Sequence, residues 1–263
     1  MLTTVHGVIV HTLELPDRDR LVWIFTRESG LLTAVAMGKR SPRVSYMAAS
    51  QIFCYGEFVL YSKSDDKYWI REIELQEPFL ALRSSIEKVA LATYLCDVIK
   101  QTATNQPDVQ LLRLLLNSLY ALTQDKYVPE LIKATFEFRA ATILGFMPDV
   151  SGCCECGGEE GGFYVNVMEG FSVCERCHAL YQDAAKEIPL PAPEDDRINN
   201  ILLWMPPRAF QAVRYCIQCP LEHILAFSLE GEDLYAFAHG AETYLLNHLE
   251  RSFASLDFYK KLI

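Results

Sequence analysis

Two cysteine pairs have the spacing of metal ligands. Cys153 and Cys156 form one C-x2-C pair, Cys174 and Cys177 form the other, and seventeen residues separate the inner cysteines. This pattern is typical of tetrahedral zinc, because each pair makes a tight turn and the intervening segment only has to bring the two turns together. Four thiolates fill the tetrahedron and leave no position for water, so we expect a structural zinc ion rather than a catalytic one.

Glycines around these cysteines favour the same interpretation. Six of the thirteen glycines fall between Gly152 and Gly170, and Gly157 and Gly158 directly follow Cys156. Both can take the positive φ that lets a backbone curl around sulfur. The alternatives are a redox dithiol or merely buried thiols, but a redox C-x-x-C normally occurs once, at the start of a helix in a βαβ unit.

Other cysteine and histidine residues leave alternatives open. Cys154 and His178 flank the four ligands, and either could replace one of them. Cys216 and Cys219 lie three residues apart in a segment with helical periodicity. They are interpreted first as buried hydrophobic thiols and otherwise as a second half-site.

Length and composition predict a globular chain of one to three domains. The chain has 263 residues, of which 51% are apolar, enough to bury a substantial core. The N-terminus lacks a basic region followed by a long apolar run, and nowhere do eighteen apolar residues follow one another, so we expect neither a signal peptide nor a membrane span. Nine cysteines without an export signal favour a reducing compartment and therefore a cytoplasmic protein.

The net charge of −10 is unevenly distributed along the chain. Residues 1–80 hold nine basic and ten acidic residues, residues 81–150 hold seven of each, and residues 151–263 hold eight basic against seventeen acidic. The excess acid is therefore C-terminal. Net charge governs long-range steering, but a local basic patch still holds phosphates within roughly 8 Å at physiological salt.

A basic segment interrupts a stretch without acid. No acidic residue lies between Glu28 and Glu57, and Lys39, Arg40 and Arg43 crowd the sequence KRSPR, which we call the basic segment (residues 39–43). The alternative interpretation is an ordinary solvated turn.

The N-terminal residues have the two-residue period of β-strands. We expect five short strands at Val5–Leu13, Leu21–Thr26, Leu31–Ala36, Ile52–Tyr61 and Tyr68–Leu75. The strand around Trp23 is apolar on both faces, which predicts that another element covers its outer side. Five strands in so short a span predict a small barrel, of which the oligonucleotide-binding (OB) fold is one example.

After Pro78 the period changes to that of helices. A first helix carries apolar residues between Leu82 and Leu95. Further helices are expected at Val109–Thr123, Pro129–Gly145, Asp195–Trp204, Pro207–Cys219 and Glu232–Leu249. A proline-rich connector, Pro189–Pro193, follows the cysteine region.

These patterns together predict an α+β protein with an N-terminal five-stranded barrel, of the class that includes the OB-fold, and an α-helical body that carries an inserted four-cysteine zinc-binding hairpin. We expect the barrel at residues 1–78 and the zinc-binding insert at 151–188. The helical body would comprise residues 79–150 and 189–263.

Four segments resemble the bacterial RecO family of DNA-repair mediators. They are DRDRLVWIFTRESGLLTAVAMGKRSPR, FEFRAATILGFMPDVSGCCECGG, FSVCERC and YLLNHLERSFASLDFY. They span nearly the whole chain and their order matches the family. The resemblance implies an N-terminal OB-fold, a helical C-terminal body and a zinc site in many members.

The resemblance also implies a function without a chemical step. Members of the family bind single- and double-stranded DNA, anneal complementary strands, and act with RecR, and in some settings RecF, to load RecA onto strands coated by single-strand-binding protein. They contact that coating protein through its acidic C-terminal tail. Such a protein would act in the bacterial cytoplasm, at the nucleoid.

Annealing two polyanions requires cations that screen phosphates and surfaces that hold bases unpaired. The candidates for phosphate contact are Lys39, Arg40 and Arg43, with Arg18 and Arg20 of the DRDR turn as second choices. Six aromatic residues of the barrel are candidates for stacking, although half or more are expected in its core: Trp23, Phe53, Tyr55, Phe58, Tyr61 and Trp69. For the partner's tail we expect a pocket among residues such as Arg113, Lys133 and Arg139 of the helical body.

Motifs of nucleic-acid enzymes are largely absent. Thr33 stands where a phosphate-cradling loop ending at Gly38-Lys39 would need its first glycine, and no cysteine pair follows a proline as in zinc deaminases. The alternative function is a zinc-stabilised, metal-dependent nuclease with Asp65-Asp66 or Asp195-Asp196 as magnesium ligands. A third interpretation is a scaffold that uses the barrel for protein contacts alone.

Overall fold

The computed structural model describes residues 2–38, 44–64, 67–180 and 201–263. The chain forms two compact units. The first contains Met1–Pro129 together with Phe253–Ile263, and the second contains Glu130–Ser252.

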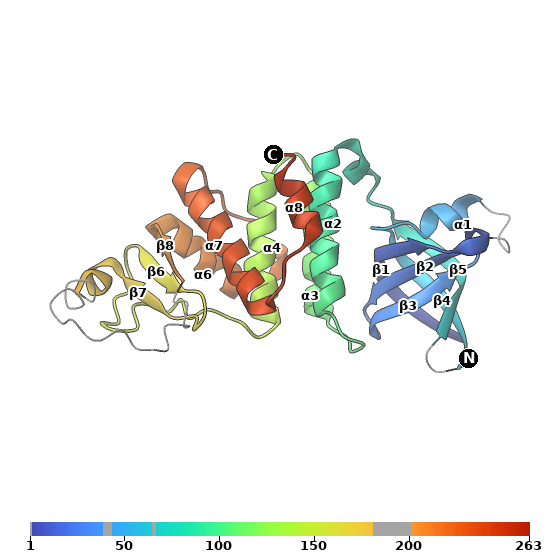
Figure 1. Ribbon diagram of the computed structural model, residues 1–263, viewed down its shortest axis with the longest axis horizontal. Helices are drawn as coiled ribbons and strands as arrows, with labels where there is room; N and C mark the ends of the chain where they lie inside the picture. Colours follow the sequence, from blue (N-terminus) through green and yellow to red (C-terminus); the bar gives the residue numbers. More distant parts are fainter. Residues whose placement is uncertain (1, 39–43, 65–66, 181–200) are drawn as a thin grey trace. The chain divides into compact units, whose positions relative to one another are not determined.

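A closed five-stranded barrel forms the N-terminal part of the first unit (Figure 1). Its strands are β1 (Leu2–Glu14), β2 (Arg20–Thr26), β3 (Gly30–Ala36), β4 (Tyr55–Ser64) and β5 (Lys67–Glu77). The order around the barrel is β1-β2-β3-β5-β4, and only the β3–β5 pair is parallel. The predicted OB-fold barrel is therefore confirmed, and each expected strand is present with shifted ends.

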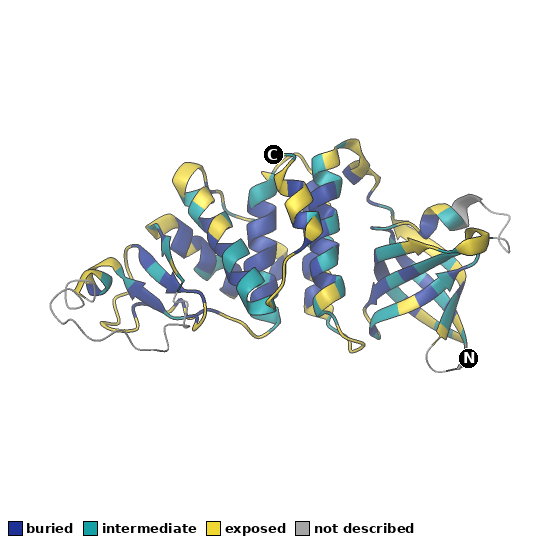
Figure 2. Cartoon of the chain, in the orientation of Figure 1, coloured by how far each residue is buried: buried dark blue, intermediate teal, exposed yellow. Residues whose placement is uncertain are grey.

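Alternate residues of the strands fill the barrel. The interior is apolar, and its buried members are Val5, Ile9, Val22, Ile24, Ala34, Ala36, Cys54, Phe58, Leu60 and Ile70. Figure 2 shows buried and exposed positions next to one another along these strands. The two-residue side-chain period of a strand places one set of residues inside and the other outside.

A helix covers the outer side of β1 and β2. This is α2 (Ile86–Thr102), which packs against both strands. The Lys100 Nζ lies 4.9 Å from the centre of the Trp23 ring. Gly30 has a φ of +64°, and a Cβ there would come within 2.3 Å of the carbonyl oxygens of Thr104 and Gln106, so this junction requires glycine. The prediction that an element covers the strand around Trp23 is confirmed.

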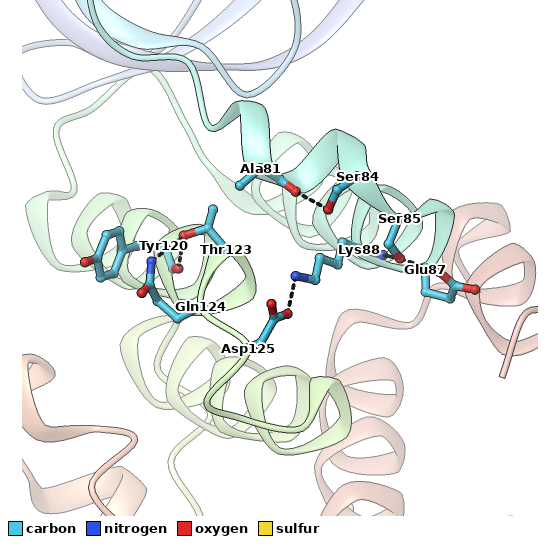
Figure 3. Close-up of polar contacts among 9 residues, drawn as sticks. All are labelled: Ala81, Ser84, Ser85, Glu87, Lys88, Tyr120, Thr123, Gln124 and Asp125. Atoms are coloured by element: carbon cyan, nitrogen blue, oxygen red, sulfur yellow. Dashed lines mark hydrogen bonds and ion pairs between the residues drawn. The ribbon is translucent and has the colours of Figure 1, made fainter.

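Two further helices, α3 (Val109–Thr123) and α8 (Ala254–Lys260), pack beside α2 in the first unit. Ser85 is the N-cap of α2 and its Oγ accepts a hydrogen bond from the Lys88 backbone N–H at 3.2 Å. The Lys88 ammonium in turn lies 2.6 Å from an Asp125 carboxylate oxygen in the turn after α3, as Figure 3 shows. This ion pair ties the start of α2 to the end of α3.

The described residues of the second unit include three long helices and a small sheet. The helices are α4 (Pro129–Ile143), α6 (Pro207–Gln218) and α7 (Gly231–Leu249). The sheet has the order β7-β6-β8, with β6 at Phe163–Asn166, β7 at Ser172–Cys174 and β8 at Leu202–Met205 (Figure 1). Among the helices that the structure describes, none is both long and apolar enough to cross a bilayer.

Buried polar contacts join the helices of this unit. The Lys133 ammonium on α4 lies 2.9 Å from a Glu137 carboxylate oxygen and 2.8 Å from Glu242 on α7. Arg139 on α4 donates hydrogen bonds to the carbonyl oxygens of Cys216 and Ile217 at the C-terminal end of α6. A cation there satisfies carbonyls that have no partner within the helix.

The predicted helix Asp195–Trp204 is wrong over its described residues. Residues 195–200 lie outside the described residues, but Leu202–Met205 form strand β8, paired with β6, where the sequence pattern indicated helix through Trp204. Pro206 and Pro207 follow directly, and a proline holds the residue before it in an extended conformation. Residues 202–205 can then pair with the edge of β6 and form a strand.

The remaining helices begin and end close to the predicted positions. Val109–Thr123 is confirmed as predicted, and α4 ends at Ile143, before Gly145 with its φ of +95°. Among the described residues, the sequence did not predict the helices α1 (Val44–Ala49) and α8 or the helical residues 175–180. The helices α1 and α8 are short, so their sequence period carries little signal.

Candidate metal centre and nucleic-acid surface

The structure brings together the four cysteines that the spacing predicted. The sulfur atoms of Cys153, Cys156, Cys174 and Cys177 all lie within 4.8 Å of one another. The first pair lies in the loop before β6, Cys174 ends β7, and Cys177 lies in the helical residues 175–180. This cluster could hold a metal ion.

The dimensions of the cluster fit a tetrahedral ion with sulfur ligands. The Cys156 and Cys174 sulfurs are 3.8 Å apart. A metal–sulfur bond of about 2.3 Å places the corners of a tetrahedron about 3.8 Å apart, so this pair already has the required separation. The widest pair needs to close by only about 1 Å.

Backbone hydrogen bonds shape the first cysteine turn. The Cys153 N–H donates to the Gly158 carbonyl at 2.8 Å, and the Gly157 N–H donates to the Cys153 carbonyl at 2.9 Å. Gly157 has a φ of +68°, as the sequence pattern predicted, whereas Gly158 does not take a positive φ. The Cys154 N–H donates to the Ser172 carbonyl at 2.9 Å, which joins this turn to β7.

The thiols of the cluster differ in acidity. Burial acts to raise the pKa of Cys153, but hydrogen bonds from the backbone N–H groups of Cys174, Cys156 and Glu155 outweigh it and bring the pKa to about 6. Burial, followed by the neighbouring thiols, raises the pKa of Cys177 to about 12. Four adjacent sulfurs cannot all ionise without a cation, and a divalent ion would supply that charge.

The alternative ligands lie outside the cluster. Cys154 is exposed, and its sulfur lies 3.8 Å from a Glu155 carboxylate oxygen. The His178 ring stacks on Tyr164 with centres 3.8 Å apart. Neither belongs to the group of four that could hold a metal.

The third cysteine pair is buried. Cys216 and Cys219 on and after α6 are 0% and 9% exposed, and burial raises the pKa of both thiols. Both therefore remain protonated at neutral pH. Among the described residues they join no cluster that could hold a metal, and they pack as small hydrophobic side chains.

The DNA-contact candidates of the barrel divide into two groups. Lys39, Arg40 and Arg43 lie outside the described residues. Arg18 is exposed in a short 3-10 helix, and Arg20 lies on β2 with a side chain that is only 14% exposed. Arg20 donates to the carbonyl oxygens of Met47 and Ser50 at 3.1 and 3.2 Å, so its guanidinium holds the end of α1.

The DRDR turn fixes both flanks of the basic segment. On the N-terminal side, an Asp19 carboxylate oxygen accepts a hydrogen bond from the Gly38 N–H at 2.9 Å. On the C-terminal side, Arg20 binds the end of α1, which begins at Val44. Asp19 and Arg20, adjacent in the chain, therefore anchor it immediately before and soon after residues 39–43.

Two of the six aromatic candidates are core residues. Phe53 and Phe58 are 1% and 0% exposed. Trp23 is half-buried beneath Lys100 and contacts His11 edge to face, with ring centres 4.9 Å apart. Tyr61 and Trp69 lie directly opposite each other on the outside of β4 and β5, with ring centres 6.4 Å apart.

Comparison with known proteins identifies the family. Residues 1–79 match the family profile described as Recombination protein O N terminal, and residues 83–190 match the one described as Recombination protein O C terminal. A protein of Symbiobacterium thermophilum named DNA repair protein RecO is 31% identical over 182 residues, covering 67% of this chain and 71% of that protein. The chain belongs to the RecO family.

Relatives in the RecO family match over the full length. The DNA repair protein RecO of Acetivibrio thermocellus is 27% identical over 258 residues, covering 97% of this chain and 95% of that protein. The DNA repair protein RecO of Alkaliphilus metalliredigens is 24% identical over 265 residues and both chains are covered completely.

The second unit of this RecO-family chain contains a cavity that the sequence did not indicate. In the second unit a cavity of about 780 Å³ is lined by α6, by Val150, Ser151 and Glu159, and by residues 227–229. These residues come from three separated stretches, and no local pattern links them.

The three residues predicted to bind a partner's tail differ in exposure. Lys133 is 5% exposed and ion-paired, and Arg139 binds α6, whereas Arg113 is exposed on α3.

Proposed function

We propose that this protein binds single- and double-stranded DNA and anneals complementary strands without a chemical step. With RecR, and in some settings RecF, it would help to load RecA onto strands coated by single-strand-binding protein. The RecO family and the barrel support this proposal. Its site of action would be the bacterial cytoplasm, at the nucleoid.

One observation carries the assignment of the DNA surface. Trp69 of the outward aromatic pair lies opposite Val35 on β3, and the basic segment begins four residues later in the chain. We propose that a strand of DNA bound by the basic segment also contacts these rings, because neighbouring strands lie only about 4.8 Å apart and the segment follows β3 closely in the chain. Cations for phosphates and rings for bases are the two requirements for single-strand binding.

A salt titration tests the phosphate contacts. If Lys39, Arg40 and Arg43 each contact a phosphate, the logarithm of the single-strand binding constant falls with the logarithm of salt at a slope of about −2, from about 0.7 per contact. Exchange of all three for glutamate should abolish binding and annealing. A flat salt response, or annealing that persists in the triple variant, contradicts the proposal.

We further propose that the four cysteines hold one structural zinc ion. Four thiolates are a ligand set that zinc prefers, and full coordination leaves no open position. Bound there, zinc would hold the first cysteine turn against β7. Metal analysis of the purified chain should find about one zinc per chain by the four-ligand rule, and Cys174→Ser should release it.

For the protein partner, we propose that the cavity of the second unit receives the acidic tail of single-strand-binding protein. Its lining combines apolar Phe227 and Leu229 with Arg208, whose side chain is 73% exposed. Apolar walls beside an exposed cation suit a peptide that carries both carboxylates and an apolar side chain. Labelled tail peptide should bind the full chain, and Arg208→Glu should weaken binding by about tenfold. Loss in Arg113→Glu instead would place the contact on α3.

A single assay separates this function from a nuclease. Labelled complementary oligonucleotides are incubated with the protein and magnesium, and the products are examined for pairing or cutting. Paired and intact strands support the mediator, whereas shortened strands support the nuclease. Asp65-Asp66 and Asp195-Asp196, its candidate ligands, lie outside the described residues. A scaffold that contacts only proteins would retain no DNA at low salt.

A further inference from the structure

One side chain of α6 binds the backbone on both sides of the first cysteine pair. The Arg214 Nε donates to the Val150 carbonyl at 2.5 Å and Nη2 donates to the Ser151 carbonyl at 2.9 Å, both just before the pair. Its Nη1 donates to the Glu159 carbonyl at 3.1 Å, just after the pair. The guanidinium therefore joins the start of the cysteine loop to its end.

The same guanidinium is itself held in place by two buried rings. It lies 4.9 Å from the centre of the Phe210 ring and 5.9 Å from that of Phe163. These rings are 0% exposed and stack with centres 4.1 Å apart. Phe163 is also the strand partner of Cys174 in the β6–β7 pair. Arg214 thus fixes the loop of the first pair relative to the strand that carries the third thiol.

We propose that Arg214 is a positioning residue of the metal centre. By holding the loop near its metal-bound shape, it lowers the conformational entropy that the chain loses when the ion binds. A guanidinium suits this role because it is planar, always charged, and carries five donors in a rigid fork, whereas a lysine ammonium has no such plane. The inference rests on the zinc ion proposed above.

The test is the zinc dissociation constant of the full-length chain, measured by competition with a chromophoric chelator. Arg214→Met should raise the constant by about 10- to 100-fold, as loss of outer-shell partners does in other metal sites, and Arg214→Lys should lie between it and the wild type. Arg208→Met is the matched control, because Arg208 lies on the same helix and its nearest ion-pair distance, to Asp233, is 3.9 Å. It removes the same charge and should change the constant by less than about twofold.

A second measurement separates positioning from general destabilisation. In the metal-free chain, amides of residues 150–159 should exchange hydrogen faster in Arg214→Met than in the wild type, with the exchange of α7 unchanged. If Arg214→Met fails to fold, Arg214→Lys decides by the same two measurements.

Three results overturn the inference. The first is a zinc dissociation constant of Arg214→Met equal to that of the wild type. Where only Arg214→Lys folds, the same comparison is made with that variant. Another is an equal loss of zinc affinity in the Arg208→Met control, which would be a general effect of charge. The third is a wild-type chain that binds no zinc, which overturns the metal proposal as well, whereas the first two leave it standing.

Discussion

Tyr61 and Trp69 face each other across strands β4 and β5 on the outside of the barrel, with their rings 6.4 Å apart and tilted by 45°. Tyr61 is 37% exposed. Such a pair can stack bases, at about 1–3 kcal/mol for each base.

The aromatic pair yields the first prediction. Trp69→Ala and Tyr61→Ala should each weaken single-strand binding by about 5- to 160-fold, from the same stacking range, with the salt slope unchanged because no phosphate contact is lost. Fluorescence titration with a labelled oligonucleotide measures both quantities. Tyr120→Ala is the control, since Tyr120 is a 59% exposed tyrosine of α3 in the same unit. Wild-type affinity in both barrel variants would remove the rings from the DNA surface.

Arg20 should prove to be a structural residue. Its guanidinium donates to two carbonyl oxygens at the end of α1 and lies 2.6 Å from a Glu14 carboxylate oxygen. Hydrogen bonds to charged groups contribute about 1.5–3 kcal/mol, so Arg20→Met should lower the free energy of unfolding by about 2–3 kcal/mol. Arg18→Met, at an exposed position, should change it by less than about 0.5 kcal/mol. Urea denaturation measures both variants, and equal stability would contradict the assignment.

Lys133 should be essential to the stability of the second unit as long as the buried Glu137 carboxylate is present. Burial acts to lower the pKa of Lys133, but Glu137 and Glu242 outweigh it and raise the pKa. Lys133→Met leaves the Glu137 carboxylate, which is 0% exposed, without its cation, and should lower the free energy of unfolding by about 3–5 kcal/mol. The double variant with Glu137→Leu should recover most of this loss, and a double variant as unstable as the single one would contradict this explanation.

The raised pKa also fixes the pH dependence of this ion pair. The stabilisation it gives is fully present below the ordinary pKa of lysine, about 10.4, and is lost as pH rises through the higher folded pKa. Wild-type unfolding measured between neutral and strongly alkaline pH should show that loss, and Lys133→Met should not.

Metal affinity should fall as the solution becomes more acidic. With the pKa of Cys153 at about 6 and that of Cys177 at about 12, the metal-free cluster at neutral pH holds protons that an ion must displace. Each proton released changes the apparent affinity by about tenfold per pH unit, and the slope steepens below about pH 6, where Cys153 also binds a proton. Chelator competition between pH 6 and pH 8 measures the slope. An affinity independent of pH would contradict thiolate ligation.

Sequence alone predicted the local features. Four cysteines at fixed spacing predicted the cluster, because short turns bring each pair together whatever the rest of the chain does. Short runs with the two-residue period of β-strands predicted the barrel strands, and helical periodicity predicted the helix Val109–Thr123. In each case the residues that carry the information are neighbours in the chain.

Only the tertiary structure decided the long-range features. Leu202–Met205 become a strand because the edge of β6 is available, which no window of neighbouring residues reveals. Arg20 binds carbonyl oxygens at the end of α1, a contact that its neighbours in the sequence do not indicate. Arg214 reaches the cysteine loop from α6, more than fifty residues further along the chain. The physical reason is that residue type and spacing determine local turns and periods, whereas the partner of a long side chain or a strand edge depends on how distant segments pack.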